Sequence, residues 1–174
     1  MLSGCLELKV TVTFKTGSTG TVEIEGVKDH LSDGLDWQGL VFPSSRVEWA
    51  AIVAQSPGSS FTSFEAVADD LGTHTKTVLG FSTSRGLESL FVSFKQKLTL
   101  LQDAQGKTTL TYAPLVPKLS AAAAETRKLW IDLWGDTQWS LKILPPNNAS
   151  AAVYAVALRD FASEKAPAEW KLNW

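Results

Sequence analysis

Cysteine and histidine, which act as nucleophile or base in many enzymes, are scarce in this sequence. Its 174 residues include one cysteine, Cys5, and two histidines, His30 and His74. A single cysteine excludes an intrachain disulfide and a cysteine-based zinc site. Two histidines in polar segments, and no serine in a G-x-S-x-G context, leave few candidates for a nucleophile and its base. We therefore expect that the chain is not an enzyme and has no catalytic residue.

Long apolar runs and blocks of one charge are also missing. The N-terminal segment MLSGCLELKV lacks the charged start and the apolar core of a signal peptide, so we expect a chain made inside the cell that contacts no membrane. The net charge is −2, from 16 basic and 18 acidic residues that are spread along the chain. This even spread provides no basic arm for gripping a phosphate backbone.

Two groups of acidic residues with a histidine are candidates for a metal site. One is Asp29 with His30 and Asp33, and the other is Asp69 with Asp70 and His74. Their oxygen-rich side chains would suit calcium better than zinc, but neither group has a known metal-loop spacing. Turns in which aspartates cap the backbone explain both groups more simply. We expect no metal and no cofactor.

Alternation with period two is the dominant pattern in the chain. In LELKVTVTFK the apolar residues share one face, and TVEIEGV repeats the alternation after a Gly17–Gly20 connection, which predicts an antiparallel hairpin. TKTVLGFSTS, LFVSFKQKLTLLQ, KTTLTYAPLV and AVYAVALRDF are further predicted strands. The segment 47–54 fits either a buried strand or a helix, whereas KLSAAAAETRK predicts a helix near residues 119–128.

These segments predict one all-β domain over residues 1–174. We expect an antiparallel jelly-roll sandwich of eight to ten strands, with one or two short helices in the connections. Residues 162–174 are predicted to form an extended C-terminal arm.

Tryptophan is unusually abundant, with seven residues in the chain. If residues 129–134 form a strand, Trp130 and Trp134 share one face, which could be core, a carbohydrate platform or a subunit interface. Alternation in EWKLNW places Trp170, Leu172 and Trp174 on one side of the arm. We predict that these five residues belong to a subunit interface. The alternative for the arm is that it folds back over its own domain.

The stretch from Phe81 to Pro117 contains a short helix-like word, GLESL, at Gly86–Leu90, between two strand-like segments, and ends in a strand that runs into proline. This order resembles the central strands of jelly-roll coat proteins of small positive-strand RNA viruses, with the tymovirus coat protein as the nearest case. The matching residues are Phe81, Leu87, Glu88, Ser89, Leu90, Val92, Leu110, Tyr112 and Pro117.

The resemblance implies a structural capsid protein that self-assembles into an icosahedral shell around a viral genome. Its partners would be many copies of itself and genomic RNA, contacted without a basic arm, and its location would be the virion after synthesis in the host cytoplasm. The alternative from another class is a β-sandwich module that binds carbohydrate or another ligand, such as a lectin-like or phage-tail domain. A small hydrolase is the third possibility.

Overall fold

The computed structural model describes residues 7–28, 43, 45–70, 72–94, 96–113, 132, 138–147, 149–157, 159–160 and 169–174. Within these ranges the chain forms mainly strands, with two helices. The strands are β1 (Glu7–Phe14), β2 (Gly20–Lys28), β3 (Ser59–Asp69), β4 (Gly72–Phe81), β5 (Lys97–Gln102), β6 (Thr108–Ala113), β7 (Gln138–Leu144), β8 (Ala152–Ala157) and β9 (Trp170–Asn173), and the helices are α1 (Arg46–Ala54) and α2 (Ser84–Ser93).

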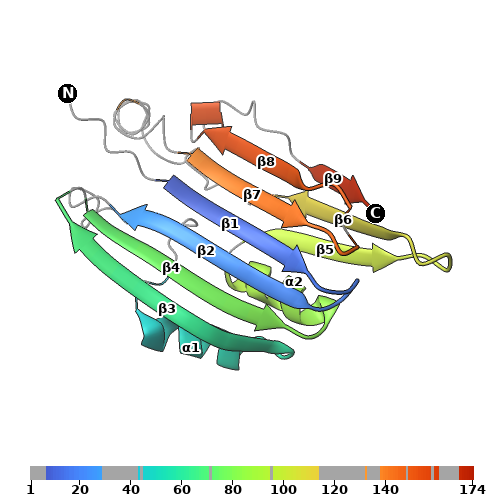
Figure 1. Cartoon of the computed structure of the whole chain (residues 1–174), viewed down its shortest axis with the longest axis horizontal. Helices are drawn as coiled ribbons and strands as arrows, with labels where there is room; N and C mark the ends of the chain where they lie inside the picture. Colours follow the sequence, from blue (N-terminus) through green and yellow to red (C-terminus); the bar gives the residue numbers. More distant parts are fainter. Residues whose placement is uncertain are drawn as a thin grey trace, which may run out of the picture.

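The larger sheet has six strands in the order β3-β4-β2-β1-β7-β8 (Figure 1). The hairpin predicted at the N-terminus is confirmed as β1 and β2, which pair antiparallel with Val12 opposite Val22. Its turn is closed by Thr16, whose Oγ1 accepts hydrogen bonds from the amides of Ser18 and Thr19. All pairs in this sheet are antiparallel except β1 with β7, which is parallel.

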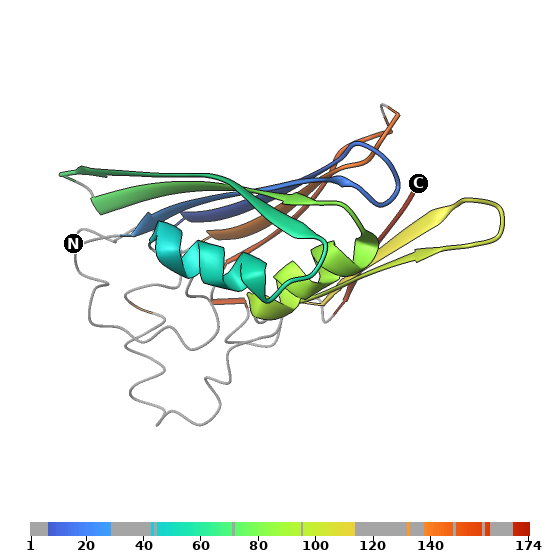
Figure 2. The same cartoon turned by 90° about the horizontal axis from the view of Figure 1, so that it is seen from below.

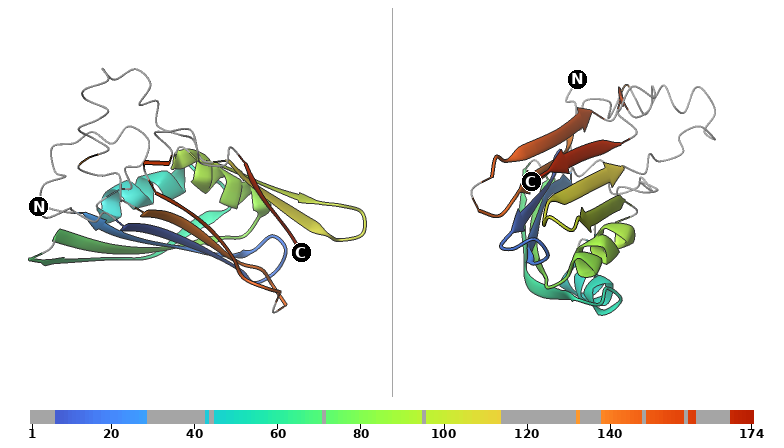
Figure 3. Two further views of the ribbon diagram at one scale, coloured as in Figure 1. Left: turned by 90° about the horizontal axis from the view of Figure 1, so that it is seen from above. Right: turned by 90° about the vertical axis from the view of Figure 1, so that its right-hand side faces the viewer.

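The smaller sheet has three strands in the order β5-β6-β9, and both helices lie on the same side of the six-stranded sheet as β5 and β6 (Figures 2 and 3). Alternation along β1 explains this layering, because Val10, Val12 and Phe14 are buried while Lys9 and the threonines between them face the other way. We call the face with Val10 the inner face and the opposite one the outer face. The core lies between the inner face, the helices and the smaller sheet.

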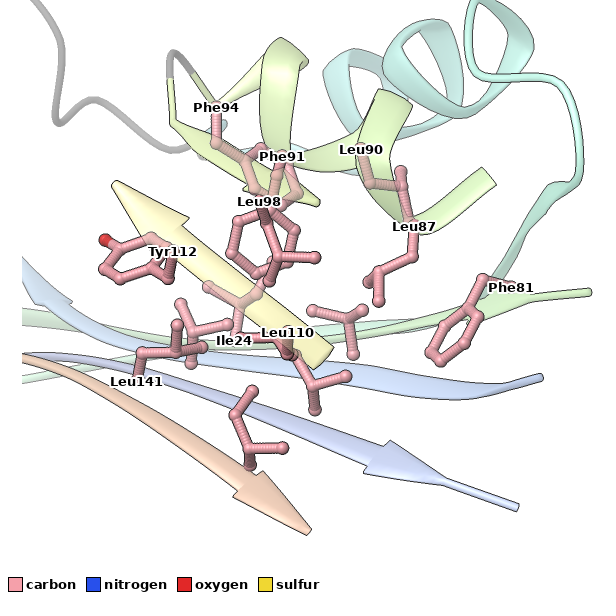
Figure 4. Packing of buried hydrophobic residues seen from close by; sticks show 14 of the residues in the cluster. Ile24, Phe81, Leu87, Leu90, Phe91, Phe94, Leu98, Leu110, Tyr112 and Leu141 are labelled. Carbon is pink, nitrogen blue, oxygen red and sulfur yellow. The ribbon is translucent and has the colours of Figure 1, made fainter. Parts of the chain in front are cut away.

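Helix α2 supplies one wall of the core. Its residues Leu87, Leu90 and Phe91, followed by Phe94, are buried at the spacing of one helical face (Figure 4). The helix begins after Thr83, whose Oγ1 accepts a hydrogen bond from the amide of Gly86 at 3.0 Å.

Helix α1 resolves the ambiguity left by the sequence at residues 47–54. Ser45 and Glu48 form a capping box, in which each side chain accepts a hydrogen bond from the backbone amide of the other. Trp49 is buried and meets Phe94 edge-on, with ring centroids 5.7 Å apart. A capped start and one buried aromatic ring favour helix over strand here.

Three expectations need correction or lie outside the described residues. The prediction of a β-rich fold with short helices is confirmed, but the jelly-roll topology and an all-antiparallel pairing are not, because the sheets have six and three strands and contain a parallel pair. The strand predicted to begin at LFVS is wrong, since residues 90–93 end α2. The helix predicted near residues 119–128 lies outside the described residues.

Candidate functional site

A shallow hollow on the outer face of the six-stranded sheet is the clearest candidate site in the described ranges. It spans strands β1 to β4 and has a volume of about 420 Å³. The residues that line it are Lys9, Glu25, Gly26, Val27, Glu65, Val67, His74, Thr75 and Lys76. This volume lies in the range of about 300–1,000 Å³ that is usual for small-molecule sites.

A row of alternating charges crosses the hollow from strand to strand. Lys9 lies opposite Glu25, Glu25 opposite Lys76, and Lys76 opposite Glu65. Lys76 is held by two carboxylates, with its Nζ 3.0 Å from Glu23 Oε2 and 3.4 Å from Glu25 Oε1. The hydrogen bond to Glu23 and the negative charge of that residue raise the pKa of Lys76 above its ordinary value.

The neighbouring row consists of Val27, His74 and Val67, which are paired across β2, β4 and β3. His74 Nε2 lies 3.0 Å from Asp69 Oδ2, so the two form an ion pair when the imidazole is protonated. Asp69 also accepts a hydrogen bond from the amide of Gly72 through Oδ1, at 3.1 Å. Asp69 therefore fixes the β3–β4 turn and the histidine together.

Glu65 differs from the other charged residues around the hollow. Lys76 is bonded to Glu23 and Glu25, and His74 lies against Asp69, whereas Glu65 has no hydrogen bond or ion pair in the part of the chain that the structure describes. Val67, two residues further on the same strand face, is 64% exposed. The hollow thus offers an unpaired carboxylate beside small apolar side chains, an arrangement that can bind a cationic group with a short apolar body.

The sequence-predicted metal groups are only partly visible. Of Asp69, Asp70 and His74, the structure brings Asp69 and His74 together, but within the described residues no three histidine, cysteine or acidic side chains gather as a metal site. The group of Asp29, His30 and Asp33 lies outside the described residues. Neither described helix is long and apolar enough to cross a membrane.

The predicted interface residues have different outcomes. Trp130 and Trp134 lie outside the described residues. Trp170 and Leu172 lie on β9, which pairs with β6 of the same chain, and Trp174 follows it, with its amide donating to Thr108 O at 3.0 Å. The described end of the arm, residues 169–174, therefore folds back over its own domain, as in the alternative considered above, and a role in a subunit interface stays a prediction.

Trp170 and Trp174 contact aromatic residues of the core. The ring of Trp174 lies 5.1 Å from that of Phe14, and the ring of Trp170 lies 5.9 Å from that of Tyr154, between centroids. Trp49 and Trp139 are buried. Among the described residues, tryptophan thus contributes to the core rather than to an exposed carbohydrate platform.

Sequence reasoning missed the hollow, although it identified the faces. Alternation assigns Lys9 and Glu25 to the side opposite the core, but it does not tell which strands are neighbours. Lys9 and Glu65 are far apart in the sequence. They line the same hollow because β1 and β3 belong to one sheet, in which β2 and β4 join them. That order is a property of the whole sheet.

Comparison with known proteins gives one structural likeness. No protein-family model matches the chain, and no curated protein matches it. The folded domain of the LppM (Rv2171) protein of Mycobacterium tuberculosis, solved by NMR, is similar with a TM-score of 0.49 and 10% identity, over 90% of this chain and 85% of that one. A likeness at this level carries no inference about function.

The resemblance to tymovirus coat proteins is corrected by this comparison, which gives a bacterial protein in place of a viral coat protein. The expected location in a virion, after synthesis in the host cytoplasm, is corrected with it. The physical reason is that the resemblance depended on the order of strands between Phe81 and Pro117. In the fold, β5 and β6 pair with the C-terminal strand β9 in a three-stranded sheet.

Proposed function

We propose that this chain is a binding module that holds a small ligand in the hollow on the outer face of its six-stranded sheet. The observation that carries the proposal is the unpaired carboxylate of Glu65 at the rim of a 420 Å³ hollow whose other charges are already engaged. A cationic group on the ligand would pair with Glu65. Its apolar part would cover Val67 and Val27.

The strand pairing around the hollow supports this function. The four strands that line it are joined by antiparallel ladders that are unbroken at the lining residues, so the side chains project from rigid elements at fixed spacing. Sites on regular elements hold their geometry better than sites on loops. Lys76 is held between Glu23 and Glu25, and His74 lies against Asp69, so the side chains beside Glu65 are already ordered before a ligand binds.

A binding screen with matched ions tests the proposal. Small alkylammonium ions and carboxylates of equal size would be titrated into the protein while the amide signals of residues 65–67 and 74–76 are followed by NMR. We expect the ammonium ions to shift these signals and the carboxylates to leave them in place. Equal shifts from both classes, or shifts confined to other elements, would contradict the proposal.

Substitution of Glu65 adds a second measurement. Glu65→Gln keeps the shape of the side chain and removes its charge. We expect the affinity for the best ammonium ion to fall by up to about fivefold, because an exposed ion pair contributes about 0–1 kcal/mol. Glu169→Gln, which removes a surface carboxylate paired with Lys171 beside the smaller sheet, is the matched control and should leave the affinity unchanged.

Other expectations from the sequence stay predictions. The shell-forming function depended on the corrected resemblance and is untested, as are the contacts with genomic RNA and the expectation that the chain is not an enzyme. For the fold, we propose a sandwich-like packing of the two sheets. Ring contacts between Phe14 and Trp174 and between Tyr154 and Trp170, which join one sheet to the other, support this packing.

A further inference from the structure

Strand β3 lies at one edge of the six-stranded sheet, and no other described strand or helix lies along the outer edge of its C-terminal half (Figure 1). A β-bulge interrupts its pairing with β4 between Phe61 and Ser63, and the β3–β4 turn begins after Asp69. Between these limits the segment Ser63–Asp69 pairs with β4 without interruption, and residues 65–69 are all exposed.

Two of the usual protections of an edge strand are missing from this segment. Natural sheets avoid edge-to-edge pairing by placing charged residues, lysine above all, proline or a bulge along the exposed edge. The segment SFEAVAD contains neither lysine nor proline, the bulge lies just before it, and its charged residues are Glu65 and Asp69. None of its residues between Phe64 and Ala68 has a backbone hydrogen bond other than those of the β3–β4 ladder.

We infer that β3 pairs with β3 of a second copy of this chain, antiparallel, around a two-fold axis at Ala66. This inference does not depend on the proposed ligand. In this arrangement the whole regular segment pairs with itself, Ser63 opposite Asp69 and Glu65 opposite Val67. The two six-stranded sheets then become one continuous sheet. The dimer is closed, because both β3 edges are paired and no third copy can pair with them.

Charge selects this register over its neighbours. In an antiparallel pair related by a two-fold axis perpendicular to the sheet, one residue lies opposite its own copy, and the outer faces of both sheets stay on the same side. The possible registers therefore differ only in which residue lies on the axis. Centring the axis on Glu65 places two like charges opposite each other, and centring it on Val67 places Glu65 opposite Asp69. Like charges directly opposite destabilise a strand pair. The Ala66 register avoids both pairs and also excludes the bulge.

The other edge of the sheet is a weaker candidate. Strand β8 has six residues, and its Tyr154 contacts Trp170 of the smaller sheet. Val153 on β8 is 57% exposed, close to the 64% of Val67 on β3. It is therefore a matched position for a control substitution.

Two substitutions that place opposite charges at residue 67 test the pairing. In the inferred dimer, Val67 lies opposite Glu65 of the second copy at two symmetric places. Val67→Glu should raise the dimer dissociation constant by roughly twofold to thirtyfold, and Val67→Lys should lower it by a similar factor, because each cross-strand charge pair contributes about 0.2–1 kcal/mol. Dissociation constants would be measured by sedimentation equilibrium at low salt on the full chain. Far-ultraviolet circular dichroism would confirm that each variant is folded.

Each outcome decides the matter. A wild-type dimer that responds to the sign of the charge at residue 67, and not to Val153→Glu, supports the inference. High salt should shrink the difference between Val67→Glu and Val67→Lys, since screening weakens exposed charges. A monomer at all concentrations, a dimer indifferent to that sign, an assembly larger than a dimer, or one weakened by Val153→Glu overturns the inference.

Discussion

At the scale of single residues, Tyr112 combines deep burial with a polar group. Its ring is fully buried, and its hydroxyl donates to Gln96 Oε1 at 2.9 Å, inside the core. Burial raises the pKa of Tyr112 well above its ordinary value of 10.0. The phenol therefore stays protonated in the folded chain at pH values where an unfolded chain ionises it.

This shift predicts an alkaline loss of stability. Below about pH 10 both states keep the proton and the free energy of unfolding does not depend on Tyr112. Above that pH only the unfolded state releases it, so stability falls by about 1.4 kcal/mol for each further pH unit. Tyr112→Phe should reduce this slope. It should also cost about 1–3 kcal/mol at neutral pH, because Gln96 loses its buried donor.

Urea denaturation between about pH 8 and 11 measures both effects. Tyr154, whose pKa is also raised by burial, remains in the variant, so part of the slope should persist. An unchanged slope in Tyr112→Phe would show that the phenol ionises equally in both states.

At the scale of elements, α2 is joined to the entry of β3 by a backbone contact. Gly86 lies in the first turn of α2, and a Cβ built there would be 2.6 Å from the carbonyl oxygen of Gly58. Gly58 has φ +85°, a conformation that glycine adopts readily. Two glycines therefore allow the helix to approach the loop between α1 and β3.

Gly86→Ala should destabilise the protein although alanine favours helices. Overpacking against a backbone atom costs about 1–3 kcal/mol, while the gain in helix propensity is about 1 kcal/mol, so we expect a net loss of up to about 2 kcal/mol in urea denaturation. Gly17→Ala is the control, since its Cβ would meet Gln102 at an ordinary 3.7 Å, and it should change stability by less than about 0.5 kcal/mol. A stabilised Gly86→Ala protein would contradict the contact.

At the scale of the whole molecule, the C-terminal strand closes the smaller sheet and joins it to the larger one. Leu172 lies opposite Leu110, and Trp174 exchanges two backbone hydrogen bonds with Thr108. The Trp174 ring also contacts Phe14 of the larger sheet. Strand β9 and the tryptophan that follows it thus contribute to both layers of a single core.

Removing residues 169–174 should therefore weaken the entire fold. We expect a loss of about 3 kcal/mol or more, the range for removing a packed tryptophan, in a single unfolding transition seen alike by circular dichroism and fluorescence. Lys171→Ala, which removes an exposed side chain paired with Glu169, should leave stability nearly unchanged. A truncated chain as stable as the full one would favour the arm as a docking element for another subunit.

Local pattern was sufficient to find the strands whose apolar and polar residues alternate clearly. The β1–β2 hairpin follows from alternation and a short polar turn, and β4, β6 and β8 follow from alternation alone. The pattern failed at LFVS, because the apolar face of α2 continues through Leu90 and Phe91 to Phe94 and resembles the start of a strand. A strand and a buried helix face are hard to distinguish over so few residues.

The sequence by itself determined that the chain is β-rich, that Lys9 and Glu25 face away from Val10 and Ile24, and that Trp170, Leu172 and Trp174 share one side of a strand. Only the tertiary structure decided which strands are neighbours. It paired β1 in parallel with β7, placed β9 on β6 and brought Glu65 into line with Lys76 and Glu25. The physical reason is that side-chain alternation is fixed within each strand, whereas strand order depends on how all the apolar faces are buried at once.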